Sequence, residues 1–533
     1  MLTGSRRDLV VLLFVCALVF WWRLGRLGLI DPDEPFYAQT ASEMLQSRDW
    51  LTPRIFGHPQ FEKPALFYWL SMASFGAWGR NEFAARVPGA LFATLLVLLT
   101  YAFGLRAFNR RSAFLGALVL ATSGVFAVTA RIMLTDVVFA FFLCGSCFAL
   151  WLGSEAARPR PAMLVTAFVF SALAVLTKGP LGFLIPALAA AAYRPASRRP
   201  LFRSSAGLVC GLLAFALIAV PWYAIMLNRY GTEYLRAFFV HENLERLIRA
   251  EHPANNRLYY YPAVFVIGSL PWLPALAVML KRVRQAEAGG RGSLFFWCWI
   301  LTSLAFFTLA QSKLPTYVLF LFAPLSLLIG VTLDSLLRAG FQSNSERGLA
   351  LGAAAVQSAA PFAVLAVPGL GAWTVPAFVF AACLLLGLAL LARRLSPGWV
   401  AASALGTGLL IICMTVWSAG TVEGETSAKA VAGELMRSTQ PGDTVLTSAF
   451  LARGIHYYTG RPVSVLSNRA RPFFSPHPLP IVKGEPGLES FVRRRGHAVC
   501  VMRGKEWQAF SSHAVTSRTV EIGDKVLAHL ESP

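Results

Sequence analysis

Charged residues are scarce in this sequence. Asp, Glu, Lys and Arg together make up 14% of its 533 residues, whereas hydrophobic residues make up 56%. Soluble globular domains typically carry about 25% charged residues, so a chain of this length is not a set of ordinary soluble domains. The composition indicates a protein that spends most of its length in a membrane.

Acidic residues are scarcer than basic ones, and the formal net charge is +21. An excess of this size can indicate nucleic-acid binding. Here, however, many of the basic residues are spread over short loops between apolar runs, where they face anionic lipid headgroups. We therefore expect no nucleic-acid partner.

Several common signatures are also missing. No A-x-A cleavage site follows the first apolar run, so we expect that run to be kept as an anchor. The C-terminal region has no Gly-rich phosphate loop, no His/Cys metal spacing and no nucleophile elbow, and it contains a single cysteine, Cys500. We therefore expect no nucleotide cofactor, and no disulfide within that region.

Long apolar runs are what the sequence does contain. A bilayer core about 30 Å thick needs roughly 20 apolar residues per helix, and about thirteen runs approach that length. The predicted fold class is an all-α polytopic membrane protein with a small C-terminal α/β domain. The runs cover approximately residues 8–24, 84–107, 113–130, 133–153, 161–177, 179–193, 206–226, 262–280, 293–311, 316–336, 349–368, 373–392 and 399–418.

The distribution of Lys and Arg predicts the orientation. If the N-terminus is cytoplasmic, every predicted inner loop is basic, as at Arg106, Arg110 and Arg111, and the short outer loops carry one such charge or none. The outer face then receives a first long loop (25–83), a second long loop (227–261) and the chain from residue 422 onward.

The composition changes after Trp417, which divides the chain into a transmembrane domain (1–421) and a soluble extracytoplasmic domain (422–533). ETSAKAVAGELMRS and LARGIHYYTG are typical of helices, and DTVLTSA, PVSVLS and HAVCVMRG are typical of strands. This pattern predicts a small α/β domain. Its role is accessory: it covers a site, contacts an acceptor or is a stabilising cap.

Three carboxylates fall within four residues in DPDE (Asp31–Glu34), directly after the first apolar run. Asp33 suits a helix N-cap and Pro35 the first turn, and the following apolar residues recur at helical spacing. We expect an amphipathic helix along the outer surface. Helix capping alone is one explanation of Asp33, and a functional carboxylate is the other.

Further charges enter the same predicted layer. FEKP supplies Glu62 and Lys63, and Arg131, Asp136, Lys178 and Lys313 lie inside apolar runs or at their outer ends. Charges at such depth are costly, so each marks a candidate functional site. All of them map to the outer leaflet. A transporter tends to hold its charges near the midplane, so this placement favours an enzyme acting on lipid-borne substrates.

Six segments resemble, in order, the motifs of the GT-C membrane glycosyltransferases, in particular the aminoarabinose-to-lipid A transferase family and its protein-mannosyltransferase-like relatives. They cover most of 1–340. The segments are PDE with YA and EML (Pro32–Leu45), FEKP (Phe61–Pro64), LTD with FA (Leu134–Ala140), LTKG (Leu176–Gly179), FFVHENLERL (Phe238–Leu247) and SKLPTYVLFLFAPL (Ser312–Leu325).

The resemblance implies an outer cavity in which a sugar on polyprenyl phosphate is the donor. Asp33 would be the catalytic acidic residue, with Glu34 beside it and Asp136 supporting it from a helix. We expect the cations around Asp33 to depress the pKa of its carboxyl group. Lys63, Arg246, Lys313 and Tyr317 would bind the donor phosphate, and Arg131 and Lys178 would support the cavity wall.

The sequence departs from this pattern at two places. The aminoarabinose transferases include an Arg after PDE, where this chain has Phe36. They also resemble metal binders that pair the Glu of FEKP with a His in the second long loop, where this chain has Asn243, with His241 two residues earlier. The resemblance therefore implies a divalent metal on Glu62 with Asn243 or His241 as a further hypothesis.

Together these features predict a glycosyltransferase of the bacterial inner membrane. It would move a sugar from polyprenyl phosphate to an envelope acceptor such as lipid A, another glycolipid, a glycan or a protein. The alternatives are a lipid-linked glycan transporter or flippase and a glycan ligase that uses a diphosphate-linked chain.

Overall fold

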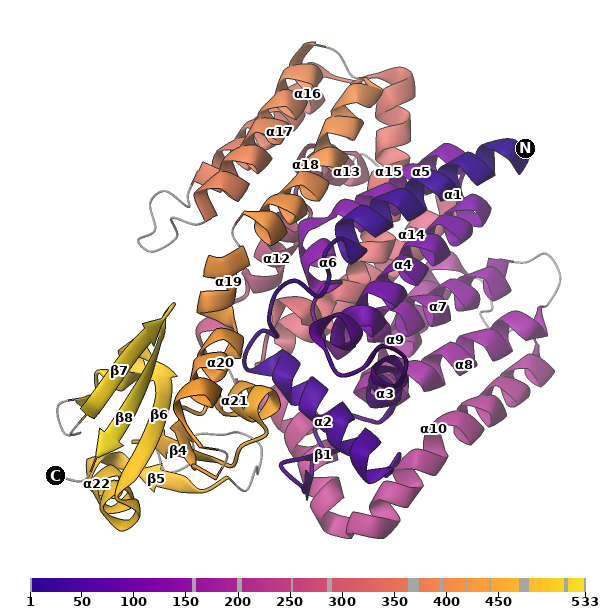
Figure 1. Ribbon diagram of the computed structural model, residues 1–533. Helices are drawn as coiled ribbons and strands as arrows, with labels where there is room; N and C mark the ends of the chain where they lie inside the picture. Colours follow the sequence, from indigo (N-terminus) through magenta and orange to yellow (C-terminus); the bar gives the residue numbers. More distant parts are fainter. Residues whose placement is uncertain are drawn as a thin grey trace.

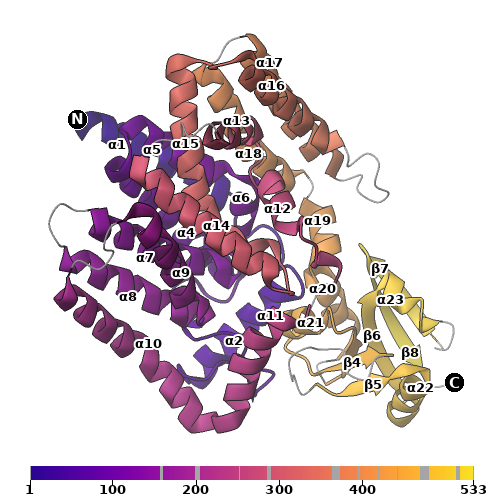
Figure 2. The same ribbon diagram turned by 180° about the vertical axis from the view of Figure 1, so that it is seen from behind.

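The computed structural model describes residues 2–155, 160–198, 204–250, 253–284, 290–362, 373–393, 396–417, 419–440, 442–468, 479–511 and 516–531. Helices dominate it, and the sheet strands gather near the C-terminus (Figure 1). The view from behind shows the same separation of the helical body from the C-terminal sheet (Figure 2).

The first half of the helical body contains most of the sequence motifs. A two-residue antiparallel ladder, β1 with β2, interrupts the helices in the predicted first long loop. The elements are α1 (Leu2–Cys16), η1 (Ala17–Trp21), α2 (Asp33–Ser47), β1 (Arg54–Ile55), β2 (His58–Pro59), α3 (Leu66–Trp78), α4 (Glu82–Ala107), α5 (Arg110–Thr122), α6 (Gly124–Thr129), α7 (Thr135–Glu155), α8 (Pro161–Lys178) and α9 (Leu181–Ser197).

The second half begins with the longest helix. The elements are α10 (Ser205–Tyr234), η2 (Leu235–Glu245), α11 (Arg246–Ile248), η3 (Pro253–Asn255), α12 (Tyr260–Gly268), α13 (Leu273–Arg284), α14 (Gly290–Leu309), η4 (Pro315–Leu321), α15 (Phe322–Ala339), α16 (Asn344–Ala359), α17 (Thr374–Arg393) and α18 (Pro397–Val416).

Seven helical spans among the described residues are long and apolar enough to cross a membrane, and the protein is a multi-pass membrane protein. Other predicted runs form helices that are shorter or broken, such as α1, α5 and α9, and the end of the run 349–368 lies outside the described residues. The spans are Glu82–Ala107, Thr135–Glu155, Pro161–Lys178, Ser205–Ile248, Pro315–Ala339, Thr374–Arg393 and Pro397–Val416.

The predicted second long loop begins as a continuation of α10. The chain bends at Gly231, whose φ of 50° and ψ of −126° are not helical. Glycine adopts positive φ without the steric cost that a side chain brings. The bend turns the chain into η2 and α11, the segment that carries Glu242 and Arg246.

The C-terminal region forms one six-stranded sheet in the order β5-β4-β3-β6-β8-β7. The first four of these strands pair in parallel, and β6, β8 and β7 pair antiparallel. The three predicted strands and two predicted helices are confirmed. The elements are α19 (Ala419–Thr426), α20 (Lys429–Ser438), β3 (Val445–Thr447), α21 (Ala452–Thr459), β4 (Val463–Ser467), β5 (Ile481–Lys483), α22 (Gly484–Arg495), β6 (His497–Arg503), α23 (Gly504–Trp507), β7 (Thr516–Ile522) and β8 (Lys525–Glu531).

Helix α2 lies between the helical body and α21 (Figure 1). Its residues from Glu34 to Ser42 are all buried, so the prediction of an amphipathic helix along the surface is wrong. The C-terminal region covers the face that a sequence pattern alone assigns to water or lipid headgroups.

Charged pairs also occur at the end of the bundle opposite α2. Asp8 pairs with Arg110 at 2.7 Å near the N-terminus, and buried Asp334 pairs with Arg338 at 2.8 Å at the end of α15. A third buried pair, Arg282 with Glu346 at 3.0 Å, joins α13 to α16. The expectation that buried charges lie at one end only is therefore wrong.

Candidate functional site

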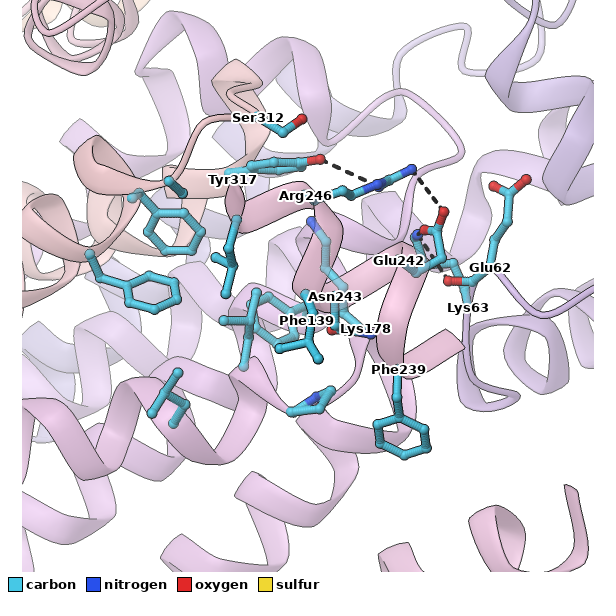
Figure 3. A pocket seen from close by; sticks show the side chains of 18 residues that line it. Glu62, Lys63, Phe139, Lys178, Phe239, Glu242, Asn243, Arg246, Ser312 and Tyr317 are labelled. Atoms are coloured by element: carbon cyan, nitrogen blue, oxygen red, sulfur yellow. Dashed lines mark hydrogen bonds and ion pairs between the residues drawn. The ribbon is translucent and has the colours of Figure 1, made fainter. Parts of the chain in front are cut away.

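A cavity of about 310 Å³ opens between α8, η2, α14 and η4. Figure 3 shows its polar side chains pointing toward one another, with aromatic and aliphatic side chains around them. Six of the polar lining residues come from four segments far apart in the sequence: Glu62, Lys63, Lys178, Glu242, Arg246 and Tyr317. Five of the six were predicted site residues, and the sixth, Glu242, was not.

Glu242 joins the predicted phosphate-binding cations. Its carboxylate contacts Lys63 Nζ at 2.9 Å and an Arg246 guanidinium nitrogen at 3.0 Å, and its side chain is 5% exposed. Burial by itself lowers the pKa of Lys63, but the Glu242 charge outweighs it and the pKa is raised. Lys63 therefore stays protonated, as a phosphate-binding group must.

The opposite wall is built from Asp136 and Lys178. Lys178 is the last residue of α8, and its ammonium group contacts Asp136 Oδ1 on α7 at 2.5 Å. The same ammonium lies 4.9 Å from the ring centroid of Tyr317, and the Tyr317 hydroxyl accepts a hydrogen bond from Arg246 at 3.5 Å. Asp136 therefore pairs with Lys178, rather than with Arg131 as an internal pair in the same segment.

A glycine allows η2 to approach this wall closely. Gly179 directly follows Lys178 and has a φ of 101°. A Cβ atom there would lie 3.0 Å from the Phe238 ring and 3.5 Å from Asn243 Oδ1. LTKG thus places its lysine in the cavity and its glycine where the second long loop crosses.

Asp33 is the first residue of α2, preceded by Pro32 at the N-cap, and no side chain caps this helix. The helix-cap explanation of Asp33 is therefore wrong. Its side chain is exposed, yet burial is the largest cause of its raised pKa, as expected for a carboxylate in a recess. Arg453 and Lys63 lower this pKa and Glu62 and Asp136 raise it, so the predicted depression of the pKa is also wrong.

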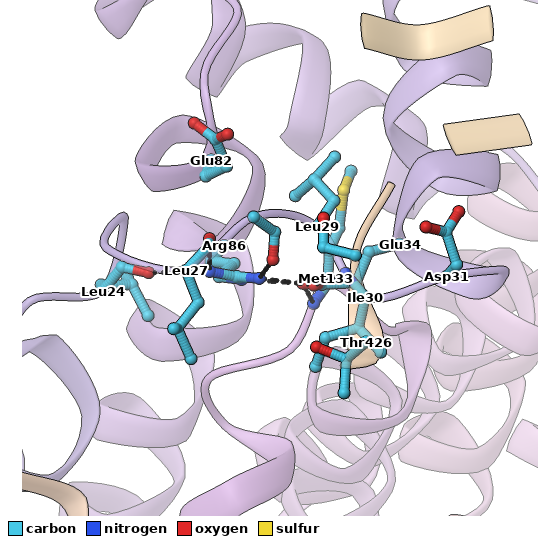
Figure 4. Close-up of polar contacts among 12 residues, drawn as sticks. Leu24, Leu27, Leu29, Ile30, Asp31, Glu34, Glu82, Arg86, Met133 and Thr426 are labelled. Atoms are coloured by element: carbon cyan, nitrogen blue, oxygen red, sulfur yellow. Dashed lines mark hydrogen bonds and ion pairs between the residues drawn. The ribbon is translucent and has the colours of Figure 1, made fainter. Parts of the chain in front are cut away.

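Glu34 has a different environment from Asp33. It is fully buried and receives two hydrogen bonds from the Arg86 guanidinium, at 2.8 and 2.6 Å. The backbone N–H groups of Ile30 and Met133 also donate to its carboxylate, each at 2.7 Å (Figure 4). Because its oxygens are already engaged, this placement favours a structural role over the predicted catalytic one.

Two other predicted cations point away from the cavity. Arg131 donates to the backbone oxygens of Val19 and Trp22 at 3.0 and 2.8 Å. Lys313 is 2% exposed, and its ammonium donates to Asn256 Oδ1 at 2.6 Å. Neither residue lines the cavity, so both brace neighbouring segments.

The predicted metal ligands are only partly brought together. Glu62 and Asn243 both line the cavity, whereas the His241 imidazole contacts Glu245 at 2.8 Å and is not among the lining residues. In the described part of the chain, no three His, Cys, Asp or Glu side chains gather as a metal site. These residues do not fit a site with three strong ligands.

Sequence reasoning missed two charged residues here. Glu242 follows His241 directly in FFVHENLERL, and its spacing of four from Arg246 is a signal for a helical ion pair. Arg453 lies in a helix of the C-terminal region, and its guanidinium reaches the Asp33 recess from there. Nothing in the local sequence distinguishes it from the other arginines of that region.

Known proteins share sequence features with this chain. A family model described as dolichyl-phosphate-mannose-protein mannosyltransferase matches residues 9–232. Undecaprenyl phosphate-alpha-4-amino-4-deoxy-L-arabinose arabinosyl transferase 2 of Pseudomonas fluorescens is 34% identical over 365 residues, which are 66% of this chain and 61% of that protein. The corresponding transferase of Erwinia tasmaniensis is 33% identical over 322 residues, 59% of this chain and 57% of that protein.

The match spans about three fifths of the length of these relatives. Solved structures extend the likeness in fold over nearly the whole chain. ArnT from Cupriavidus metallidurans bound to undecaprenyl phosphate superposes with a TM-score of 0.79 at 22% identity, covering 98% of this chain and 97% of that one. The archaeal oligosaccharyltransferase AglB from Archaeoglobus fulgidus gives a TM-score of 0.52 at 13% identity, covering 94% and 69%.

Proposed function

Because this chain has the GT-C fold and resembles the aminoarabinose transferases in sequence, we propose that it is a glycosyltransferase. It moves one sugar from a polyprenyl-phosphate donor to a cell-envelope acceptor: lipid A, another glycolipid, a glycan or a protein. The relatives named above are arabinosyl transferases whose names specify undecaprenyl phosphate-aminoarabinose, and this proposal extends the lipid-phosphate part of that chemistry to this chain.

The observation that carries the proposal is the charge arrangement in the cavity. Lys63 and Arg246 converge on Glu242, and Tyr317 lies between Arg246 and Lys178. A lipid phosphate that replaces Glu242 as the partner of Lys63 and Arg246 gains charge-assisted hydrogen bonds. Lys313, which faces Asn256, is not part of this group.

The reaction breaks the bond between the sugar C1 atom and the phosphate oxygen and forms a bond from C1 to the acceptor atom. The electron pair leaves with the lipid phosphate, whose developing charge Lys63 and Arg246 stabilise. Asp33 accepts the acceptor proton or stabilises the positive charge that develops on the sugar. Its raised pKa makes it a better proton acceptor than an ordinary aspartate. Asp136 holds Lys178 in place, and no step is derived through a metal.

We also propose the location and division of the molecule. The protein lies in a bacterial inner membrane with its N-terminus in the cytoplasm, which puts the cavity and residues 422–533 on the outer side. The basic inner loops support this orientation. Residues 1–421 form the catalytic membrane domain.

The test is mass spectrometry of polyprenyl-phosphate sugars and envelope glycans. It compares cells with the intact protein, no protein, Asp33→Asn or Asp524→Asn, at equal membrane abundance. Asp524 precedes β8 and is 41% exposed, so its replacement is a matched loss of one carboxylate away from the cavity.

We expect Asp33→Asn to match the deletion: a sugar-phosphate lipid accumulates, and one sugar mass disappears from an envelope glycan. Asp524→Asn should match the intact protein. Normal glycans with Asp33→Asn would overturn the assignment of Asp33. Unchanged donor and glycan pools in the deletion would overturn the transferase proposal and favour transport.

A further inference from the structure

Arg453 belongs to the C-terminal region but lies at the start of α2. Its guanidinium carbon is 4.6 Å from the centroid of the Phe36 ring, and its side chain is 12% exposed. Phe36 itself is 2% exposed. A guanidinium stacked on a buried ring has one face fixed, and its N–H groups then point along a defined plane.

The helix that carries Arg453 is fixed to the first loop by several contacts. The Leu29 N–H donates to the Tyr458 hydroxyl at 2.7 Å, and Arg80 donates to the Tyr457 carbonyl oxygen at 2.5 Å. One position farther along α21, Gly454 packs so closely on Asp31 that a Cβ atom would lie 2.2 Å from Asp31 Oδ1. Arg453 is therefore held in place rather than extended freely into solvent.

The charges around Arg453 are those of the transferase site. A guanidinium nitrogen lies 4.0 Å from Glu62 Oε1, and Arg453 is the strongest charge that lowers the pKa of Asp33. By contrast, the cavity cations Lys63, Arg246 and Lys178 contact carboxylates at 2.9, 3.0 and 2.5 Å.

The contact with Glu62 leaves room for a stronger partner. Charge-assisted N–H to oxygen bonds are about 2.7–2.9 Å long, so a contact of 4.0 Å is a loose ion pair. A phosphate oxygen placed in the plane of the guanidinium would gain bonds of ordinary length, and arginine binds phosphate through two parallel N–H groups.

We propose that Arg453 binds a phosphate group of a substrate, so that the C-terminal region completes the transferase site. This inference rests on the proposed function, and it assigns residues 422–533 a direct part in substrate binding. The phosphate belongs either to the lipid donor or to a phosphorylated acceptor, since both present the same oxygen chemistry to a guanidinium.

The experiment measures lipid affinity for the full chain in detergent by native mass spectrometry, with no turnover. The probes are undecaprenyl phosphate, bisphosphorylated lipid A, and undecaprenol as the phosphate-free reference. The variants are Arg453→Gln, Arg453→Lys and the matched control Arg437→Gln. Arg437 is in the same region but is 76% exposed and pairs with Glu434.

For Arg453→Gln we expect at least a tenfold loss of affinity for one of the two phosphate lipids, which identifies the phosphate that Arg453 binds. Arg453→Lys keeps the charge but lacks the planar fork, so its loss should be about threefold or more. It is the decisive variant if Arg453→Gln does not fold. Undecaprenol binding and all Arg437→Gln affinities should be unchanged.

Affinities within twofold of the intact protein for both phosphate lipids, in either folded Arg453 variant, would overturn the inference. Because binding is measured without transfer, this outcome is separate from failure of the proposed function. A protein that binds lipid phosphate through Arg453 but transfers no sugar would refute the transferase proposal alone.

Discussion

Neighbouring residues in this protein have unrelated environments. Asp33 lies in a recess with an exposed carboxylate, whereas Glu34 points into the protein and is paired with Arg86. The helical geometry of α2 separates them, because adjacent residues on a helix project about 100° apart. DPDE therefore combines an anchoring carboxylate with one available for chemistry.

Replacing Glu34 should destabilise the protein strongly. Glu34→Gln leaves the Arg86 guanidinium, 4% exposed, without a charge partner, and breaking a buried ion pair costs about 3–5 kcal/mol. We expect a clear fall of the unfolding temperature in detergent. Glu245→Gln, which removes a 38% exposed carboxylate paired with His241, should change stability by less than about 1 kcal/mol. Equal stability of the two variants would contradict the anchoring role.

Replacing Glu242 should make the cavity depend on an anion. Glu242→Gln leaves Lys63 and Arg246 close together without the carboxylate that joins them, so the unfolding temperature should fall. Undecaprenyl phosphate should then raise that temperature more in the variant than in the intact protein, because the phosphate substitutes for the lost charge. The measurement is thermal unfolding with and without the lipid. An equal rise in both proteins would show that the phosphate does not bind at these cations.

At the level of elements, α21 is the link between the sheet and the helical body. It contacts α2, and Gly454 lies against Asp31. The chain segment that bears Phe36 and the segment that bears Arg453 therefore depend on each other for their positions.

Gly454→Ala should loosen this link. The added methyl group cannot fit 2.2 Å from Asp31 Oδ1, so α21 must move away from α2. We expect faster hydrogen exchange of the α21 amides by at least tenfold and a weaker effect of Arg453 on lipid binding. Gly433→Ala in α20, where the nearest group is the Arg437 side chain at 3.8 Å, should be neutral or stabilising. Unchanged exchange in Gly454→Ala would contradict the close packing.

At the level of the whole molecule, Asp31 makes the attachment of the C-terminal region depend on pH. It accepts a hydrogen bond from the Ala428 N–H at 2.7 Å, and its own N–H donates to the Thr426 carbonyl oxygen at 2.9 Å. Burial raises the pKa of Asp31 to about 8, with Lys525 and the Ala428 and Gly454 N–H groups lowering it and Glu34 raising it.

This shift predicts lower stability at high pH. The folded protein keeps the Asp31 proton up to about pH 8, whereas an ordinary aspartate loses it near 3.8. Between these values the folded state binds more protons, so stability falls as pH rises and levels off above about 8. Thermal unfolding of the full chain from pH 5 to 9 should show this slope, and Asp31→Asn should flatten it. Parallel curves for Asp31→Asn and Asp524→Asn would contradict the assignment.

Much of the candidate site follows from sequence because each motif is local. FEKP, LTKG and LPTY deliver Glu62, Lys63, Lys178 and Tyr317 to one cavity. Lys313 and Arg131 did not follow, since charge and depth predict that a side chain needs a partner but not which one. Asn256 and two backbone oxygens met that need.

The sequence by itself determined the membrane class, the helices and strands, and the residues able to bind a lipid phosphate, because hydrophobic period and residue type act over short distances. Only the tertiary structure decided the partners. It buried α2 beneath α21, brought Glu242 between two cations and placed Arg453 over Phe36. These contacts join residues hundreds of positions apart, and long-range packing of this kind leaves no periodic signal in either segment.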